Sequence, residues 1–177
     1  MKKQILVGLF LTFSSFALAA GNHTGGHGHD DHAKKHDHGD HHKTSAVGAI
    51  GVEKNVTRTI SITMLETDDG EMLFEPAQFA VKADETIRLS FTNKGELDHE
   101  FVMDDDHGIE KHRKEMLAAL ESGNHAHHDH HGSNSISLKP GQTGEIIWQF
   151  TNDGQFQFAC LIPGHFEAGM RGVLTVR

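Results

Sequence analysis

Two strand-like segments flank a loop in QFQFACLIPGHFEAGMRGVLTV, residues 155–176. Phenylalanine alternates with glutamine in the first segment, and VLTV forms the second. A proline–glycine pair favours a loop between them. That loop contains Cys160, the only cysteine of the chain, followed by His165 and Met170 at steps of five residues. A step of five changes face in a strand and rotates by about 140° around a helix, so the three side chains can converge only if the loop wraps around a centre.

The three side chains of the loop are soft or borderline metal ligands. Two histidines and one cysteine with a weak axial methionine make up the blue-copper ligand set. Cys160, His165 and Met170 therefore form that set with one imidazole missing. The alternative for Cys160 is a small buried apolar residue, because free cysteines are often buried.

The second histidine is expected from a neighbouring strand. Strand periodicity in LDHEFVM puts four side chains on one face, namely Leu97, His99, Phe101 and Met103. His99 is the best candidate, although a histidine on an inner face can also be a core residue that hydrogen-bonds to the backbone. His107 and His112 could substitute, but they lie beside or on a predicted helix.

Most of the chain after residue 55 has the pattern of short strands. Strand-like segments occupy residues 56–64, 72–81, 86–93, 97–103, 135–138, 145–150, 155–159 and 173–176. Turn residues such as Asn-Lys-Gly, Pro-Gly and Asn-Asp-Gly separate them. This organisation predicts an all-β fold, an antiparallel sandwich or barrel of about eight strands.

One segment has helical rather than strand periodicity. In residues 109–122 the apolar side chains recur at helical spacing, after a run of three aspartates and before Gly123. Acidic residues at the start and a glycine at the end favour a helix. We therefore expect an amphipathic helix inserted between strands.

The first 19 residues predict a signal peptide that is cleaved after Ala19. Two lysines precede an apolar run at residues 5–16, and Ala-Leu-Ala then fits the small-x-small cleavage pattern. A membrane anchor is the alternative, but the run is shorter than the about 20 residues that span a bilayer. A lipid anchor needs a cysteine at the cleavage site, and the only cysteine is far away. The expected product is a soluble, periplasmic protein without a membrane anchor.

Cleavage leaves 158 residues, which suits one domain with its own core. The mature chain has 14 basic and 25 acidic residues, a formal charge of −11. This charge argues against nucleic acid as a partner and is compatible with cations. The expected organisation is a signal peptide at 1–19, a disordered tail at 20–50 and one domain at 51–177, with an insertion at about 104–132.

Thirteen of the 17 histidines lie in two polar tracts. They are His23, His27, His29, His32, His36, His38, His41 and His42 in the tail, and His125, His127, His128, His130 and His131 after the predicted helix. Such tracts cannot bury enough apolar surface to order themselves, and His-rich tracts are candidate metal binders. The alternative is a solvated linker. Met64, Met72, Met103 and Met116 could add Cu(I) ligands, with core packing as the safer interpretation.

Several stretches resemble the cupredoxins, the type 1 blue-copper family. The resemblance rests on HEF at 99–101 in a strand and on Cys-x4-His-x4-Met ahead of a final strand. The Cys-to-His spacing is similar to that of azurins. MLFEPAQFAVKADETIRLSFTN and FACLIPGHFEAGMRGVLTV resemble bacterial copper-tolerance cupredoxins of the CopI type, over residues 56–177.

The resemblance implies a Greek-key β-sandwich with one copper ion. It implies that His99, Cys160 and His165 form a trigonal plane around the metal, with Met170 axial. Two positions depart from the family pattern: Asp98 replaces a glycine whose carbonyl approaches copper in azurins, and Glu100 replaces an asparagine common after the first histidine.

The expected function is copper binding with one-electron Cu(I)/Cu(II) chemistry in the service of copper tolerance. The His-rich tracts favour this role over the alternative, a diffusible periplasmic electron carrier. We expect a monomer whose partners are copper ions and a periplasmic redox or copper-transport protein. A Cu(I)-oxidising activity is compatible with this site, although the residues do not assign an enzymatic reaction.

Three other metal chemistries fit the sequence less well. A binuclear purple copper centre needs two cysteines. A multicopper oxidase carries histidines beside its cysteine, whereas Ala159 and Leu161 flank Cys160. A catalytic zinc site with one cysteine and two histidines gives Met170 no role.

Overall fold

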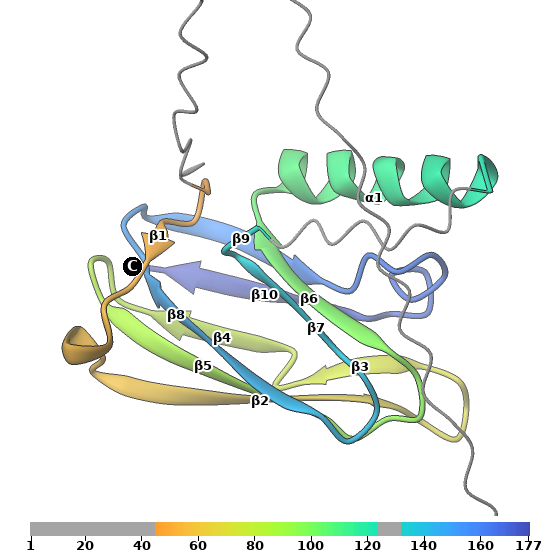
Figure 1. The fold of residues 1–177 in the computed structure, drawn as a ribbon. Coiled ribbons are helices and arrows are strands. Elements are labelled where there is room, and N and C mark those ends of the chain that lie inside the picture. Colours follow the sequence, from red (N-terminus) through yellow and green to blue (C-terminus); the bar gives the residue numbers. More distant parts are fainter. Residues whose placement is uncertain (1–44, 124–131) are drawn as a thin grey trace, which may run out of the picture. The chain divides into compact units, whose positions relative to one another are not determined.

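The computed structural model describes residues 45–123 and 132–177 (Figure 1). The predicted signal peptide and all thirteen histidines of the two tracts lie outside the described residues. The described residues belong to one compact unit, His41–Arg177.

Ten strands and one α-helix make up the described part of the chain. The strands are β1 (Ala49–Ile50), β2 (Arg58–Glu66), β3 (Met72–Glu75), β4 (Gln78–Val81), β5 (Thr86–Asn93), β6 (His99–Asp104), β7 (Ser135–Leu138), β8 (Thr143–Gln149), β9 (Gly154–Ala159) and β10 (Arg171–Val176); helix α1 spans Asp106–Glu121 and a 3-10 turn η1 spans Glu53–Asn55.

The strands form two five-stranded sheets. The first has the order β1-β8-β5-β2-β3 and the second β4-β10-β9-β6-β7. Two pairs, β2 with β5 and β4 with β10, are parallel, and the others are antiparallel. Apolar residues of both sheets share one core, so the molecule is a sandwich rather than a barrel (Figure 1). The predicted all-β sandwich with one inserted helix is confirmed.

The segment predicted as a single strand at residues 72–81 changes sheet in its middle. β3 pairs with β2 in the first sheet, and β4 pairs with β10 in the second. Pro76 lies between them, where a residue without a backbone N–H cannot continue a ladder. The pattern of residues within 72–81 does not reveal this change of sheet.

The sandwich begins earlier than the sequence predicted. Val47 is completely buried in the core, and β1 pairs with β8 through Ala49 and Gln149. The side-chain amide of Asn152 also donates a hydrogen bond to the Ala46 carbonyl over 2.7 Å. Residues 45–50, which we assigned to the tail, therefore belong to the domain. A two-residue strand has too short a pattern to be recognised without its partner.

The core lies between the sheets and is built by alternating side chains. In β5, Ile87, Leu89 and Phe91 have no exposed surface, and in β6 Phe101 is equally buried. Phe91 meets Phe101 across the two sheets with ring centroids 4.7 Å apart, and Phe101 stacks on Phe158 of β9 at 5.3 Å. These contacts fix β6 and β9, the two strands that lead into the candidate site.

Helix α1 packs on the outer face of the second sheet. Figure 1 shows the helix beside β6 and β9. Ile109 is buried with Val102 of β6 and Ala159 of β9 in a small apolar cluster separate from the main core. The helix begins three residues before the predicted start because the Asp105 side chain accepts a hydrogen bond from the Gly108 amide over 2.7 Å. Among the described residues, no helix is long and apolar enough to span a bilayer.

The β4–β5 turn is tied to β2 by Glu85, and this tie predicts how stability depends on pH. Its carboxylate accepts hydrogen bonds from Thr57, Arg58 and the Lys82 amide. The hydrogen bond from Arg58 is the largest of the effects that lower the pKa of Glu85 from 4.5 to about 2.

We expect Glu85→Gln to lower the free energy of unfolding by about 1 kcal/mol at pH 7, since Arg58 is partly exposed to solvent. The folded chain keeps Glu85 charged down to about pH 2, whereas the unfolded chain protonates it near pH 4.5. The difference between wild type and variant should therefore shrink as pH falls through this window. Urea denaturation at pH 7, 4 and 2.5 measures it, with exposed Glu75→Gln as the control. A difference that does not change with pH contradicts the prediction.

Candidate metal centre

The four predicted ligand residues lie at one end of the second sheet. His99 is the first residue of β6, and Cys160 follows the last residue of β9. His165 and Met170 lie in the loop between β9 and β10. His99, Cys160 and Met170 have no exposed surface, and His165 is 8% exposed. The site is therefore closed to bulk water except at one imidazole.

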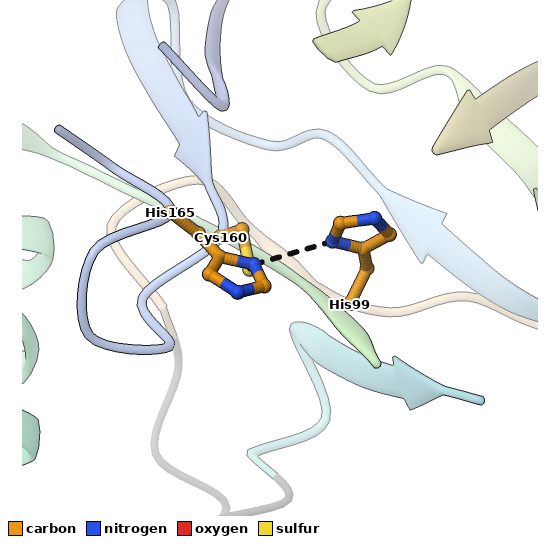
Figure 2. A group of neighbouring side chains, drawn as sticks. All are labelled: His99, Cys160 and His165. Carbon is orange, nitrogen blue, oxygen red and sulfur yellow. Dashed lines mark hydrogen bonds between the residues drawn. The ribbon is translucent and has the colours of Figure 1, made fainter. Parts of the chain in front are cut away.

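The side chains of His99, Cys160 and His165 converge on one point (Figure 2). The two Nδ1 atoms are 3.3 Å apart, and the sulfur of Cys160 is 3.4 Å from Nδ1 of His165. The three donor atoms lie within 4.8 Å of one another. Two imidazole nitrogens and one sulfur form a soft to borderline donor set that suits copper. The residues present thus fit the metal that the sequence predicted.

The loop between β9 and β10 closes through its own backbone. The Cys160 amide donates to the Met170 carbonyl, and the Met170 amide donates to the His165 carbonyl, each over 3.0 Å. Gly164 and Gly169 adopt φ values of 93° and 103°, which glycine reaches without a steric cost. The predicted wrapping of the loop is confirmed, and it places the backbone of Met170 beside that of Cys160.

Burial sets the protonation of Cys160 in the metal-free protein. Desolvation raises the pKa of the thiol to about 12, although the Glu100 and Ile162 amides act in the opposite direction. The Glu100 amide lies 3.4 Å from the sulfur and donates a hydrogen bond to it. Coordination of a metal ion by Cys160 would require loss of the thiol proton, and the Glu100 amide would stabilise the resulting thiolate.

Both histidines favour the neutral form. Burial lowers the pKa of His99 and of His165, and for His165 the nearby His99 lowers the pKa further. Neutral imidazoles carry the lone pair that a metal ion needs. The pocket thus presents two neutral nitrogen donors at neutral pH.

Glu66 is a further residue of the site that the sequence analysis missed. Its Oε1 atom lies 2.8 Å from Nε2 of His99, close enough for the carboxylate to attract a proton on that nitrogen. Partial burial acts to raise the pKa of Glu66, but hydrogen bonds from the Glu96 and Leu97 amides lower the pKa below its ordinary value. One signal was visible: Glu66 continues the inward face of Ile62 and Met64, where a carboxylate is exceptional.

Other sequence candidates do not reach the donor group. His107 is exposed and His112 half-buried, and both lie on α1 outside the group of converging donors. Leu97, predicted on the same face as His99, precedes β6 and is 45% exposed. It lies in the turn before the strand, where the alternation of faces does not apply.

The four candidate Cu(I)-binding methionines pack in apolar surroundings. Met64 and Met103 are fully buried in the main core, and Met72 packs against it. Met116 contacts the smaller cluster under α1. Core packing explains them all.

Helix α1 braces the loop that carries His165 and Met170. Arg113 of the helix forms an ion pair with Glu167 of the loop over 2.9 Å, and its guanidinium lies 5.6 Å from the ring centre of Phe166. Arg171 covers the same ring at 5.0 Å. Phe166 also packs against the apolar cluster beneath the helix. The inserted helix is therefore part of the support of the site.

Comparison with known proteins relates most of the chain to copper proteins. Residues 61–177 match the model of a family described as copper binding proteins, plastocyanin/azurin family. The copper-resistant cuproprotein CopI of Rubrivivax gelatinosus is 35% identical over 178 residues, covering 100% of both chains. The copper-resistant cuproprotein CopI of Pseudomonas aeruginosa is 36% identical over 155 residues, covering 75% of this chain and 83% of the relative.

Solved structures share the fold at lower identity. Reduced auracyanin from Roseiflexus castenholzii superposes with a TM-score of 0.55 at 24% identity, covering 69% of this chain and 98% of that one. An azurin from Methylomonas sp. strain J superposes with a TM-score of 0.52 at 18% identity, covering 69% and 99%. Both are similar to this chain in the two-sheet sandwich.

The brace on the loop predicts a local effect of Arg113→Ala. The variant loses the ion pair with Glu167 and the contact with Phe166, so the loop should open more often. We expect amide hydrogen exchange of residues 168–170 in the metal-free protein to accelerate about 3- to 10-fold. Hydrogen-exchange mass spectrometry measures this rate. Lys111→Ala, which removes an exposed cation of the same helix, should leave the exchange rate unchanged. Equal exchange rates in Arg113→Ala and Lys111→Ala contradict the support of the loop by Arg113.

Proposed function

Because the chain belongs to the plastocyanin/azurin family of copper-binding proteins, we propose that it holds one type 1 copper ion through His99, Cys160, His165 and Met170. Membership of this family confirms the resemblance predicted from the sequence. The copper ion, when bound, supplies a one-electron Cu(I)/Cu(II) couple. We propose further that the protein serves copper tolerance in the periplasm.

The observation that carries the ligand assignment is the convergence of three donor atoms in a buried pocket. Nδ1 of His99, Nδ1 of His165 and the sulfur of Cys160 face one point and lie within 4.8 Å of one another. Met170 is held beside Cys160 by a backbone hydrogen bond. A buried pocket whose loop is closed by backbone hydrogen bonds needs little rearrangement when the charge of the ion changes, which suits one-electron exchange.

His165 supports a route for electrons or copper between the site and solvent. It is the one proposed ligand with exposed surface, at 8%. The other three proposed ligands are fully buried. A partner protein or an incoming ion therefore meets the site first at this imidazole.

Two observations support copper tolerance over the role of a diffusible electron carrier. The relative from Rubrivivax gelatinosus, which matches the chain over its full length, is named a copper-resistant cuproprotein. The chain also carries thirteen histidines in its two tracts. We propose that these histidines capture additional copper and that residues 1–19 direct export to the periplasm. An electron carrier has no evident use for such tracts.

Substitution of the thiolate tests the copper site. We expect copper-loaded wild type to show an intense visible absorption band from charge transfer between sulfur and Cu(II). Cys160→Ser should abolish that band, because a hydroxyl replaces the thiolate. Visible and EPR spectra measure the change.

Met64→Leu serves as the matched control, since Met64 is a fully buried methionine of the same core that is not a proposed ligand. It should leave the visible band intact. Survival of the band in Cys160→Ser overturns the ligand assignment.

Growth on copper tests the biological role. A strain that lacks the protein should become copper-sensitive while respiring normally, and the wild-type gene should restore growth. Cys160→Ser should fail to restore it. A variant that lacks residues 22–42 has lost the eight tail histidines but keeps the described domain. It should restore growth of the deletion strain only partly and bind less copper per chain. Lost respiratory electron flow without copper sensitivity supports the carrier role instead.

A further inference from the structure

The carboxylate of Glu66 lies behind the histidine that β6 contributes to the site. We propose that Glu66 is a positioning residue: it holds His99 in the tautomer that leaves Nδ1 free for copper, and its negative charge favours Cu(II) over Cu(I). The second part rests on the copper site proposed above, whereas the first concerns the metal-free protein as well.

The imidazole of His99 lies between the carboxylate and the pocket. Its Nε2 atom is 2.8 Å from Oε1 of Glu66, and its Nδ1 atom is 3.3 Å from Nδ1 of His165. A neutral imidazole carries one proton, which settles on the nitrogen that faces the stronger acceptor. A charged carboxylate is a stronger acceptor than the neutral imidazole of His165. The carboxylate therefore favours the proton on Nε2 and leaves the lone pair of Nδ1 facing the pocket. A carboxylate behind a ligand histidine fixes the tautomer and raises the basicity of the ring in other metal sites.

The carboxylate is held in place by the turn that leads into β6. Oε2 accepts a hydrogen bond from the Glu96 amide over 2.9 Å, and Oε1 accepts one from the Leu97 amide over 3.0 Å. A side chain on Gly95 would collide with the same carboxylate, because a Cβ atom there would lie 2.2 Å from Oε2. Glu66 is thus tied both to the turn and to His99, and only 18% of its side chain is exposed.

A fixed negative charge next to a ligand histidine has a definite electrostatic effect. Cu(II) carries one more positive charge than Cu(I), so the carboxylate stabilises the oxidised site more than the reduced one. Partial burial reduces the screening by water. Glu66 should therefore lower the reduction potential relative to the same site with a neutral side chain.

A purely structural role for Glu66 makes different predictions. If the carboxylate only anchored the turn through the Glu96 and Leu97 amides, its replacement would change stability but neither the tautomer of His99 nor the potential. Glu66→Gln separates the two roles, because glutamine has nearly the same shape and retains one oxygen acceptor while it loses the charge.

The first test uses the metal-free, full-length protein. Long-range ¹⁵N–¹H NMR of ¹⁵N-histidine-labelled wild type should show His99 protonated on Nε2, and Glu66→Gln should shift population toward the Nδ1–H form. The positioning role is overturned if His99 of wild type is protonated on Nδ1. It is also overturned if Glu66→Gln leaves the tautomer population of His99 unchanged. This measurement does not depend on copper.

The second test uses the copper-loaded proteins. The reduction potential of Glu66→Gln should shift upward from that of wild type, while Glu75→Gln, which removes an exposed carboxylate from the neighbouring strand β3, should leave it nearly unchanged. Equal shifts in the two variants, or none, overturn the electrostatic role. A wild-type protein that lacks the visible copper band overturns the proposed function instead, and the NMR result still decides the contact between Glu66 and His99.

Discussion

The hydrogen bond from the Cys160 amide to the Met170 carbonyl is the constraint on which the candidate site depends. It extends the pairing of β9 with β10, in which Ala159 is opposite Arg171, by one step into the loop. The nine residues between Cys160 and Met170 must then fold back as a closed turn. This closure confines Cys160, His165 and Met170 to one small volume. The antiparallel pairing of β9 with β10 makes the loop rigid.

The same sheet supplies the remaining parts of the site. β6 lies beside β9, with Val102 opposite Ala159, so His99 at the start of β6 reaches the pocket from a direction that the loop cannot supply. The next amide along β6, that of Glu100, donates to the sulfur of Cys160. On the outer face of this sheet, Arg113 of α1 forms an ion pair with Glu167 of the loop. The donors are therefore held by interlocking strands and a helix, as a rigid ligand set requires.

Residue patterns predicted the individual strands and the helix well, but they did not predict which strands pair with one another. Alternation along β5 and β6 identified the buried faces, and the acidic run with apolar spacing identified α1. The change of sheet at Pro76 and the pairing of β1 with β8 were not predictable in this way. Periodicity reports which face of a segment is apolar, but it does not say which distant strand will lie beside it.

For the site, the spacing of Cys160, His165 and Met170 was sufficient to predict a loop that closes on a metal, because ligand chemistry and steps of five residues are local properties. Strand periodicity already favoured His99 over His107 and His112, and the tertiary structure supplies the physical reason, since β6 pairs with β9 and brings His99 to Cys160. The role of Glu66 depends on the tertiary structure even more. Glu66 and His99 belong to different sheets, and only the packing of one sheet on the other brings the carboxylate to the imidazole.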